Sequence, residues 1–127
     1  MKTIAIFEAQ TIAPSASADS AVIDLSGMYG DYSQYIRPDG FFSIQYAVTG
    51  SGKATIEYLL SNDMVTYSQP DNVDDVAVDV SRISGPLEDG NGIIGFYDVP
   101  ISRAMKIRVS ETAGIASITI TATMAIQ

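Results

Sequence analysis

The sequence predicts an all-β fold: a single antiparallel β-sandwich, or jelly-roll-like, domain of about eight or nine short strands. Polar and apolar residues alternate with the strand period of two in several segments, including the last one at 117–127. Clusters of Gly, Pro, Asn and Asp separate these segments every ~8–12 residues, and no segment repeats its apolar residues at helical spacing. The chain has 127 residues, 46% of them hydrophobic, so residues 1–127 are expected to form one domain.

The first part of the chain predicts two strands, at 4–12 and 21–25, with a loop of small residues at 14–20 between them. The segment 1–20 has two interpretations. It is either the first strand of the chain's own sandwich, because sequential strands usually pair within a domain, or an arm that adds to the sheet edge of a neighbouring subunit. The next segment, 27–40, is rich in Gly and Tyr and is expected to be irregular.

The centre of the chain shows the clearest alternation, over 42–48 and again over 54–60. The short glycine-containing link Gly50-Ser51-Gly52-Lys53 joins the two runs, a pattern that predicts a β-hairpin. Ser61-Asn62-Asp63 predicts a turn, because Asn and Asp bond their own backbone and tolerate left-handed dihedral angles. A short return strand is expected at 65–67.

The second half alternates between loops and strands in the same way. The predicted loops and turns lie at 70–75, 85–92 and 112–114, and the predicted strands at 76–80, 93–97, 105–109 and 117–127. Pro100 is expected to end the strand at 93–97. The acidic residues of the first loop and the strand after it allow a Ca²⁺ site, but their spacing favours a solvated loop; they are Asp71, Asp74, Asp75 and Asp79.

The composition argues against most kinds of active site. The chain contains no Cys, His or Trp, so it lacks a thiolate nucleophile and both the commonest general base and the commonest transition-metal ligand. The link at 50–53 resembles a phosphate-binding loop, yet Ala47 and Ala54 occupy positions where that motif needs Gly and Ser or Thr. We therefore expect a protein that is not an enzyme, with no catalytic, cofactor-binding or metal-binding residues and no cofactor.

The net charge of −8 disfavours binding to nucleic acid or to an anionic membrane. No apolar run approaches the roughly 18 residues of a membrane span, and the first residues are too soon polar for a secretory signal. These features predict a protein that is made and used in a cytoplasmic-type compartment, or that leaves it without a secretory signal. The charge is uneven, because residues 1–100 carry fourteen acidic against four basic residues while 101–127 carry three basic residues and Glu111.

Two groups of residues are candidates for contact with another protein. One is the aromatic loop, where the alternative is core filling; its residues are Tyr29, Tyr32, Tyr35 and Arg37. The other is the basic segment with Arg103, Lys106 and Arg108, interpreted either as a solvated hairpin or as a basic edge that meets acidic groups of a neighbour.

Residues 40–127 resemble small β-sandwich virion structural proteins of tailed bacteriophages. The resemblance lies in the strand at 42–46, the Ser-Asn-Asp turn, the loop and strand from Gly90 to Pro100, the strand at 105–112 and the Thr-rich end. It implies a building part of a particle, of the capsid decoration (cement) or head–tail type, that acts as a homo-oligomer such as a trimer. The implied partners are other virion subunits, above all the major capsid protein, with assembly in the host cytoplasm.

This resemblance favours a non-enzymatic capsid decoration protein of the virion. The alternative function is a carbohydrate- or ligand-binding β-sandwich module of a phage tail, neck or fibre, which would use the Tyr-rich loop.

Overall fold

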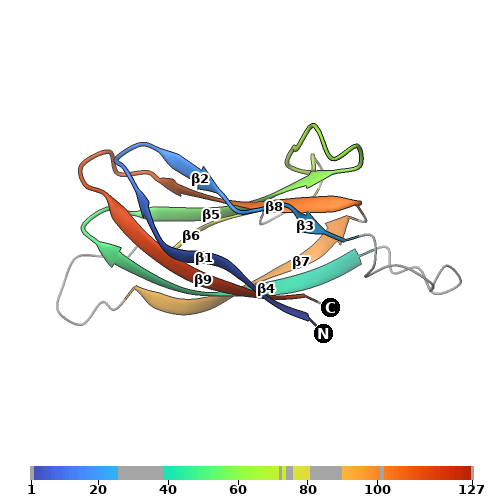
Figure 1. Cartoon of the computed structure of the whole chain (residues 1–127), viewed down its shortest axis with the longest axis horizontal. Coiled ribbons are helices and arrows are strands. Elements are labelled where there is room, and N and C mark those ends of the chain that lie inside the picture. Colours follow the sequence, from blue (N-terminus) through green and yellow to red (C-terminus); the bar gives the residue numbers. More distant parts are fainter. Residues whose placement is uncertain are drawn as a thin grey trace, which may run out of the picture.

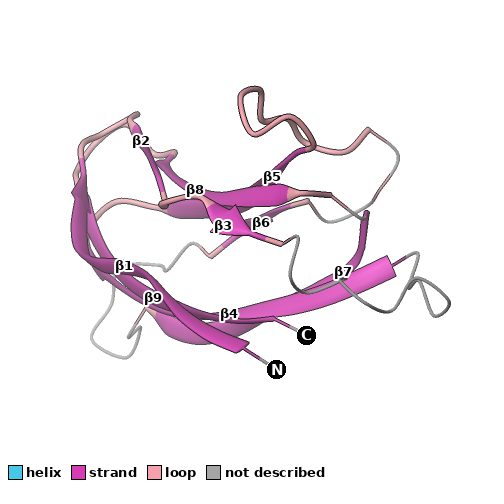
Figure 2. Ribbon diagram, turned by 45° about the vertical axis from the view of Figure 1, so that its right-hand side comes forward, coloured by secondary structure: helices cyan, strands magenta, loops and turns pink. Residues whose placement is uncertain are grey.

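A computed structural model describes residues 2–25, 39–71, 73, 76–80, 90–100 and 102–126 of the chain. It confirms the all-β sandwich: nine strands form two antiparallel sheets that face each other, and the described residues contain no helix (Figure 1, Figure 2). The strands are β1 (Lys2–Ile12), β2 (Ser17–Asp19), β3 (Ile23–Asp24), β4 (Asp39–Gly50), β5 (Ala54–Ser61), β6 (Ala77–Asp79), β7 (Asn91–Pro100), β8 (Ala104–Glu111) and β9 (Ile118–Ile126).

The order of the strands within the two sheets gives the fold its jelly-roll-like character. Sheet A has the order β1-β9-β4-β7, and sheet B has the order β2-β8-β5-β6 with β3 also paired to β8. Apart from β5 and β6, no two paired strands follow each other in the sequence. The chain therefore crosses from one sheet to the other again and again, and most strand pairs join distant parts of the sequence.

The predicted hairpin at 42–60 is wrong. Its first strand, β4, lies in sheet A, and its second strand, β5, lies in sheet B. Strands β8 and β9 also lie in different sheets, β8 in sheet B and β9 in sheet A, so the C-terminal segment is not a hairpin either. A crossing lets two apolar rows face each other across the core, whereas a hairpin would put both in one sheet. Gly50 makes the turn with a φ of 103°. A Cβ atom at this position would lie only 2.5 Å from the Ser117 carbonyl oxygen, so a residue with a side chain does not fit.

Other elements differ from the prediction only locally. Residues 17–19 form strand β2 where a loop was expected, because Ser17 to Asp19 pair with β8. Residues 65–67 form no strand; the segment makes one isolated bridge, between Ser68 and Leu60. Residues 2–12 belong to the chain's own sheet A, where they pair with β9.

An aromatic cluster fills part of the core between the sheets. Phe42 and Phe96 of sheet A stack with ring centroids 4.9 Å apart, and Tyr58 of sheet B meets them edge-on at 5.4 and 5.3 Å. All three side chains are buried, and large aromatic side chains are among the strongest contributors to core stability. Burial, together with the negative charge of Asp98, raises the pKa of Tyr58, so this phenol stays neutral.

Three connections between the two sheets meet at one end of the sandwich, at the left of Figure 1, and Glu111 is hydrogen-bonded to all three. Its side chain points inward from β8 and is 2% exposed. Oε1 accepts hydrogen bonds from the backbone N–H groups of Ser15, at 3.1 Å, and Gly114, at 2.7 Å. Oε2 accepts hydrogen bonds from those of Lys53 and Ala113, both at 2.9 Å. One carboxylate therefore joins the β1–β2, β4–β5 and β8–β9 connections.

These four hydrogen bonds favour the charged form of Glu111. The bond from the Lys53 N–H has the largest effect, burial opposes it, and together they lower the pKa of Glu111 from 4.5 to about 2. A carboxyl group whose pKa is lower in the folded than in the unfolded chain stabilises the fold above the unfolded value. That contribution is lost as the pH falls from about 4.5 towards about 2.

We expect Glu111→Gln to lower the melting temperature at neutral pH by on the order of 10 °C. The amide has one acceptor oxygen in place of two, and its NH₂ group faces backbone donors. The measurement is thermal unfolding followed by circular dichroism from pH 7 to pH 2, where the difference from the wild type should shrink below pH 4.5. Glu8→Gln is the control, since it removes the same charge from an exposed side chain. Equal melting temperatures for the two variants at pH 7 would contradict the role of Glu111.

Candidate functional site

On the outer face of sheet A, one row of side chains on each of β4, β7 and β9 carries no charge, and the exposed Asp98 of β7 lies just beyond the end of its row. Strand alternation and cross-strand register place one row each from β4, β7 and β9 on this face. We call these rows the uncharged face; they comprise Phe41, Ser43, Gln45, Ala47, Thr49, Asn91, Ile93, Gly95, Tyr97, Thr119, Thr121, Thr123 and Ala125. In a chain with a net charge of −8, such a broad surface without charge is unusual.

An apolar strip runs along the β7 side of the uncharged face. Ile93 and Tyr97 are each 68% exposed, and Phe41 is 42% exposed. The rings of Phe41 and Tyr97 stack with centroids 6.5 Å apart. Tyr97 lies over Gly95, with its hydroxyl oxygen 2.9 Å from the place a Cβ of Gly95 would take, so its ring extends along β7 towards Ile93. Large exposed apolar side chains gathered in this way are typical of a binding surface.

A β-bulge in β7 presents Tyr97. Phe42 pairs with Phe96 and Gly40 with Val99, so Tyr97 and Asp98 together oppose one residue of β4. Asp98 takes a left-handed conformation with φ of 57°, which Asp and Asn adopt more readily than other residues except Gly. The extra residue turns the strand and sets Tyr97 beside Phe41. Bulges of this kind are common at sheet edges and beside functional positions.

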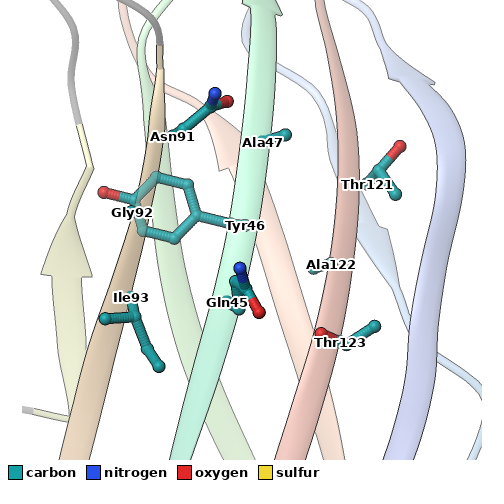
Figure 3. Close-up of a pocket in the computed structure, with 9 residues that line it drawn as sticks. All are labelled: Gln45, Tyr46, Ala47, Asn91, Gly92, Ile93, Thr121, Ala122 and Thr123. Carbon is teal, nitrogen blue, oxygen red and sulfur yellow. The ribbon is translucent and has the colours of Figure 1, made fainter.

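The centre of the uncharged face is a shallow, open depression of about 620 Å³ (Figure 3). It lies over β4, β7 and β9, and its exposed polar side chains include Gln45, Thr121 and Thr123. Ile93 forms part of its lining on the β7 side. A broad depression of this kind, lined by small polar groups and an exposed aliphatic side chain, suits contact with a protein surface better than enclosure of a small molecule.

The outer face of sheet B has the opposite character. Arg108 binds Asp19 across β8 and β2, with Nε 2.7 Å from Oδ1 and Nη2 3.1 Å from Oδ2. The bond from Arg108 lowers the pKa of Asp19. Glu57 accepts a hydrogen bond from the Gln69 side chain, and Asp79 accepts one from Thr55 Oγ1 at 2.6 Å. Charged and hydrogen-bonded side chains thus gather on one sheet, and the uncharged face lies on the other.

The structure describes three of the predicted contact residues, Arg103, Lys106 and Arg108. The expected basic edge is wrong in its position, because β8 is an inner strand between β2 and β5. Arg108 is engaged with Asp19, and Lys106 places its Nζ 4.4 Å from the centroid of the Tyr67 ring, a cation–π contact. Arg103 is exposed just before β8. A contact role for these residues stays a prediction.

The aromatic loop lies outside the described residues, so the contact role of Tyr29, Tyr32, Tyr35 and Arg37 also stays a prediction. Asp74 and Asp75 of the acidic cluster lie outside them too. Among residues that the structure describes, no group of three His, Cys, Asp or Glu side chains could hold a metal ion. Within the same residues, no helix is long and apolar enough to cross a membrane.

Two motifs from the sequence have structural roles. The link at 50–53, which resembles a phosphate loop, gives its Lys53 N–H to Glu111. The turn after β5 is confirmed: Asp63 Oδ1 accepts hydrogen bonds from the N–H groups of Val65 and Thr66, both at 2.9 Å. Met64 takes φ of 61° in this turn, where Gly would fit without strain, and its N–H binds Ser61 Oγ at 2.8 Å.

Sequence reasoning missed the uncharged face, although one signal for it was present. The polar members of the alternating runs at 42–48 and 117–127 are Thr, Ser and Gln, with no charged residue among them. A half-exposed strand usually carries charged side chains on its solvent side. The Glu111 cluster had no such signal, because its partners lie far apart in the sequence.

No family model and no curated protein matches the sequence, but solved structures share its fold. The VP2 subviral particle of infectious bursal disease virus gives a TM-score of 0.54 at 12% identity, over 98% of this chain and 31% of that chain. The enzymatically active domain of tailspike protein 4 from bacteriophage CBA120 gives 0.52 at 9% identity, over 98% of this chain and 15% of that one. The chain thus spans less than a third of either protein. At identities this low, the structural similarity shows a shared fold and nothing more.

The Arg108–Asp19 pair is partly exposed, at 39% and 33% of the two side chains, so its contribution should be small. A double-mutant cycle of Arg108→Ala and Asp19→Ala, measured by urea unfolding, should give a coupling energy of about 0.5 kcal/mol that declines with added salt. Arg103→Ala combined with Asp19→Ala should be additive. Coupling of zero in the first pair at low salt would contradict the ion pair.

Proposed function

We propose that the chain is a non-enzymatic structural protein of a virus particle, and that it works as a capsid decoration protein of a tailed bacteriophage. The observation that carries the proposal is the division between the charged outer face of sheet B and the uncharged face of sheet A. The proposed partner of the uncharged face is another virion subunit, with the major capsid protein as the first candidate.

The physical argument rests on the cost of removing water. Charged side chains lose their hydration when a partner covers them, and this cost often cancels their attraction. The uncharged face avoids that cost, and its apolar strip of Phe41, Ile93 and Tyr97 gains from burial. Aromatic residues in the centre of an interface commonly supply much of the binding energy. Sheet B keeps its charges in water.

The fold supports the same proposal. Of the two structures compared above, one is a virus particle protein and the other a phage tailspike domain. The resemblance of residues 40–127 to phage virion proteins adds the decoration role and the expectation of a homo-oligomer. The tailspike domain is enzymatically active, but this chain covers 15% of it. We take the chain as non-enzymatic because its sequence contains neither His nor Cys.

The test places one charge in the middle of the uncharged face. Thr123 is exposed on the inner strand β9 and lines the depression, so Thr123→Lys should leave the fold intact. We expect the amount of protein in purified particles of the encoding virus to fall at least ~10-fold, because a lysine buried against a partner is unpaired. Quantitative mass spectrometry of the particles measures this amount.

Ala77→Lys is the control, since it adds the same charge to an exposed position of β6 on sheet B. It should enter particles like the wild type. Absence of the wild-type protein from particles would overturn the proposal, and so would normal incorporation of Thr123→Lys. A glycan array tests the alternative: specific binding to a glycan would favour a carbohydrate-binding tail or fibre module.

A further inference from the structure

Strand β7 forms one edge of sheet A in the part of the chain that the structure describes. The Val48 N–H donates to the Gly90 carbonyl oxygen at 2.8 Å, which fixes the hydrogen-bonding phase of the β4–β7 ladder. In an antiparallel ladder every second residue bonds the neighbouring strand. Gly92, Ile94 and Phe96 therefore bond β4, and the N–H and C=O groups of Ile93 and Gly95 point away from it.

The other sheet edges are short or interrupted. β2, β3 and β6 contain three, two and three residues. β1 is long, but its pairing with β9 shifts register twice and Ala9 has φ of 48°. Such bulges and short edges are ways in which proteins prevent strand pairing between molecules. β7, with ten residues, has one bulge near its end and regular pairing with β4 from Phe96 to Asn91.

The regular part of β7 also lacks the charges that usually protect an edge. Residues 91–97 contain no Lys, Arg, Asp, Glu or Pro. Ile93, whose main-chain groups point outward from the edge, is itself 68% exposed. Two molecules that each carry a net charge of −8 repel each other on average. The uncharged stretch 91–97 is therefore a place where two copies can approach at little electrostatic cost, and the exposed Asp98 lies beyond it.

We propose that β7 pairs with β7 of a second copy of this chain, antiparallel and about a two-fold axis perpendicular to the sheet. Antiparallel pairing of two identical strands is self-complementary, as a two-fold interface requires. The two four-stranded sheets would then form one continuous sheet. Both uncharged faces would lie on the same side, with the two Ile93 side chains near the axis. The inference adds a second surface to the proposed particle protein without depending on its location in a particle.

The test uses the purified chain alone. Light scattering after size-exclusion chromatography, and sedimentation equilibrium, should give twice the chain mass of 13.5 kDa. Ile93→Lys should raise the dissociation constant of the dimer at least ~10-fold, because it places two like charges next to each other across the axis. Ile93→Thr, which keeps a β-branched and uncharged side chain, should remain dimeric. Circular dichroism checks that both variants are folded.

Hydrogen exchange gives a second readout at the strand itself. The amide hydrogens of Ile93 and Gly95 should exchange slowly in the wild type and rapidly in Ile93→Lys, while that of Ile94 stays protected in both. Thr123→Lys is the matched control, because it puts the same charge on the same face but on an inner strand. This variant should stay dimeric even though it is expected to leave particles.

Several results would overturn the pairing of two copies. They are a monomeric wild type at about 100 μM, an unchanged dimer in Ile93→Lys, and dissociation by Thr123→Lys, which would indicate stacking of the faces. A monomeric wild type whose Ile93→Lys variant fails to enter particles would assign the edge to a different protein. The three results that would overturn the pairing are obtained with the purified chain and do not depend on whether the protein is found in a particle, so the two proposals can fail separately.

Discussion

A single carboxylate joins the parts of this chain that the sequence keeps far apart. Glu111 accepts backbone hydrogen bonds from three connections, and each of these carries the chain from one sheet to the other. Backbone N–H groups in such tight crossings have no ladder partner, and leaving them buried without an acceptor would be costly. A charged acceptor with two oxygens satisfies four of them at one point. The two sheets are thereby held in a fixed relation, and with them the two outer faces.

The contrast between those faces links the fold to the proposed role. Alternation along each strand sends one row of side chains into the core and the other to the surface. On sheet B the surface row is charged and engaged with its neighbours, as Arg108 is with Asp19. On sheet A it consists of small polar residues bordered by aromatic and aliphatic ones. A rigid sandwich with one such side can cover the surface of another protein, as the proposed role requires.

Strands could be predicted from the sequence because period two is a local property, as at 42–48 and 117–127. Their partners could not. The link from Gly50 to Lys53 suits a hairpin and a crossing equally well, and the crossing is stabilised by Glu111, 58 residues beyond Lys53. The inner position of β8 likewise depends on β2 and β5, both distant in sequence. The uncharged face could be predicted in part. Its uncharged alternating residues can be read from the sequence, but the pairing that places them on one surface cannot.

The position of β9 has a consequence for how the protein is made. This strand follows the other described strands in the sequence, yet it lies inside sheet A and separates β1 from β4. Until the ribosome has released residues 118–126, the first strand has no pairing partner and the inner row of sheet A stays exposed. Folding is therefore completed only after translation of these residues. During synthesis, the nascent chain offers hydrophobic segments that chaperones can bind.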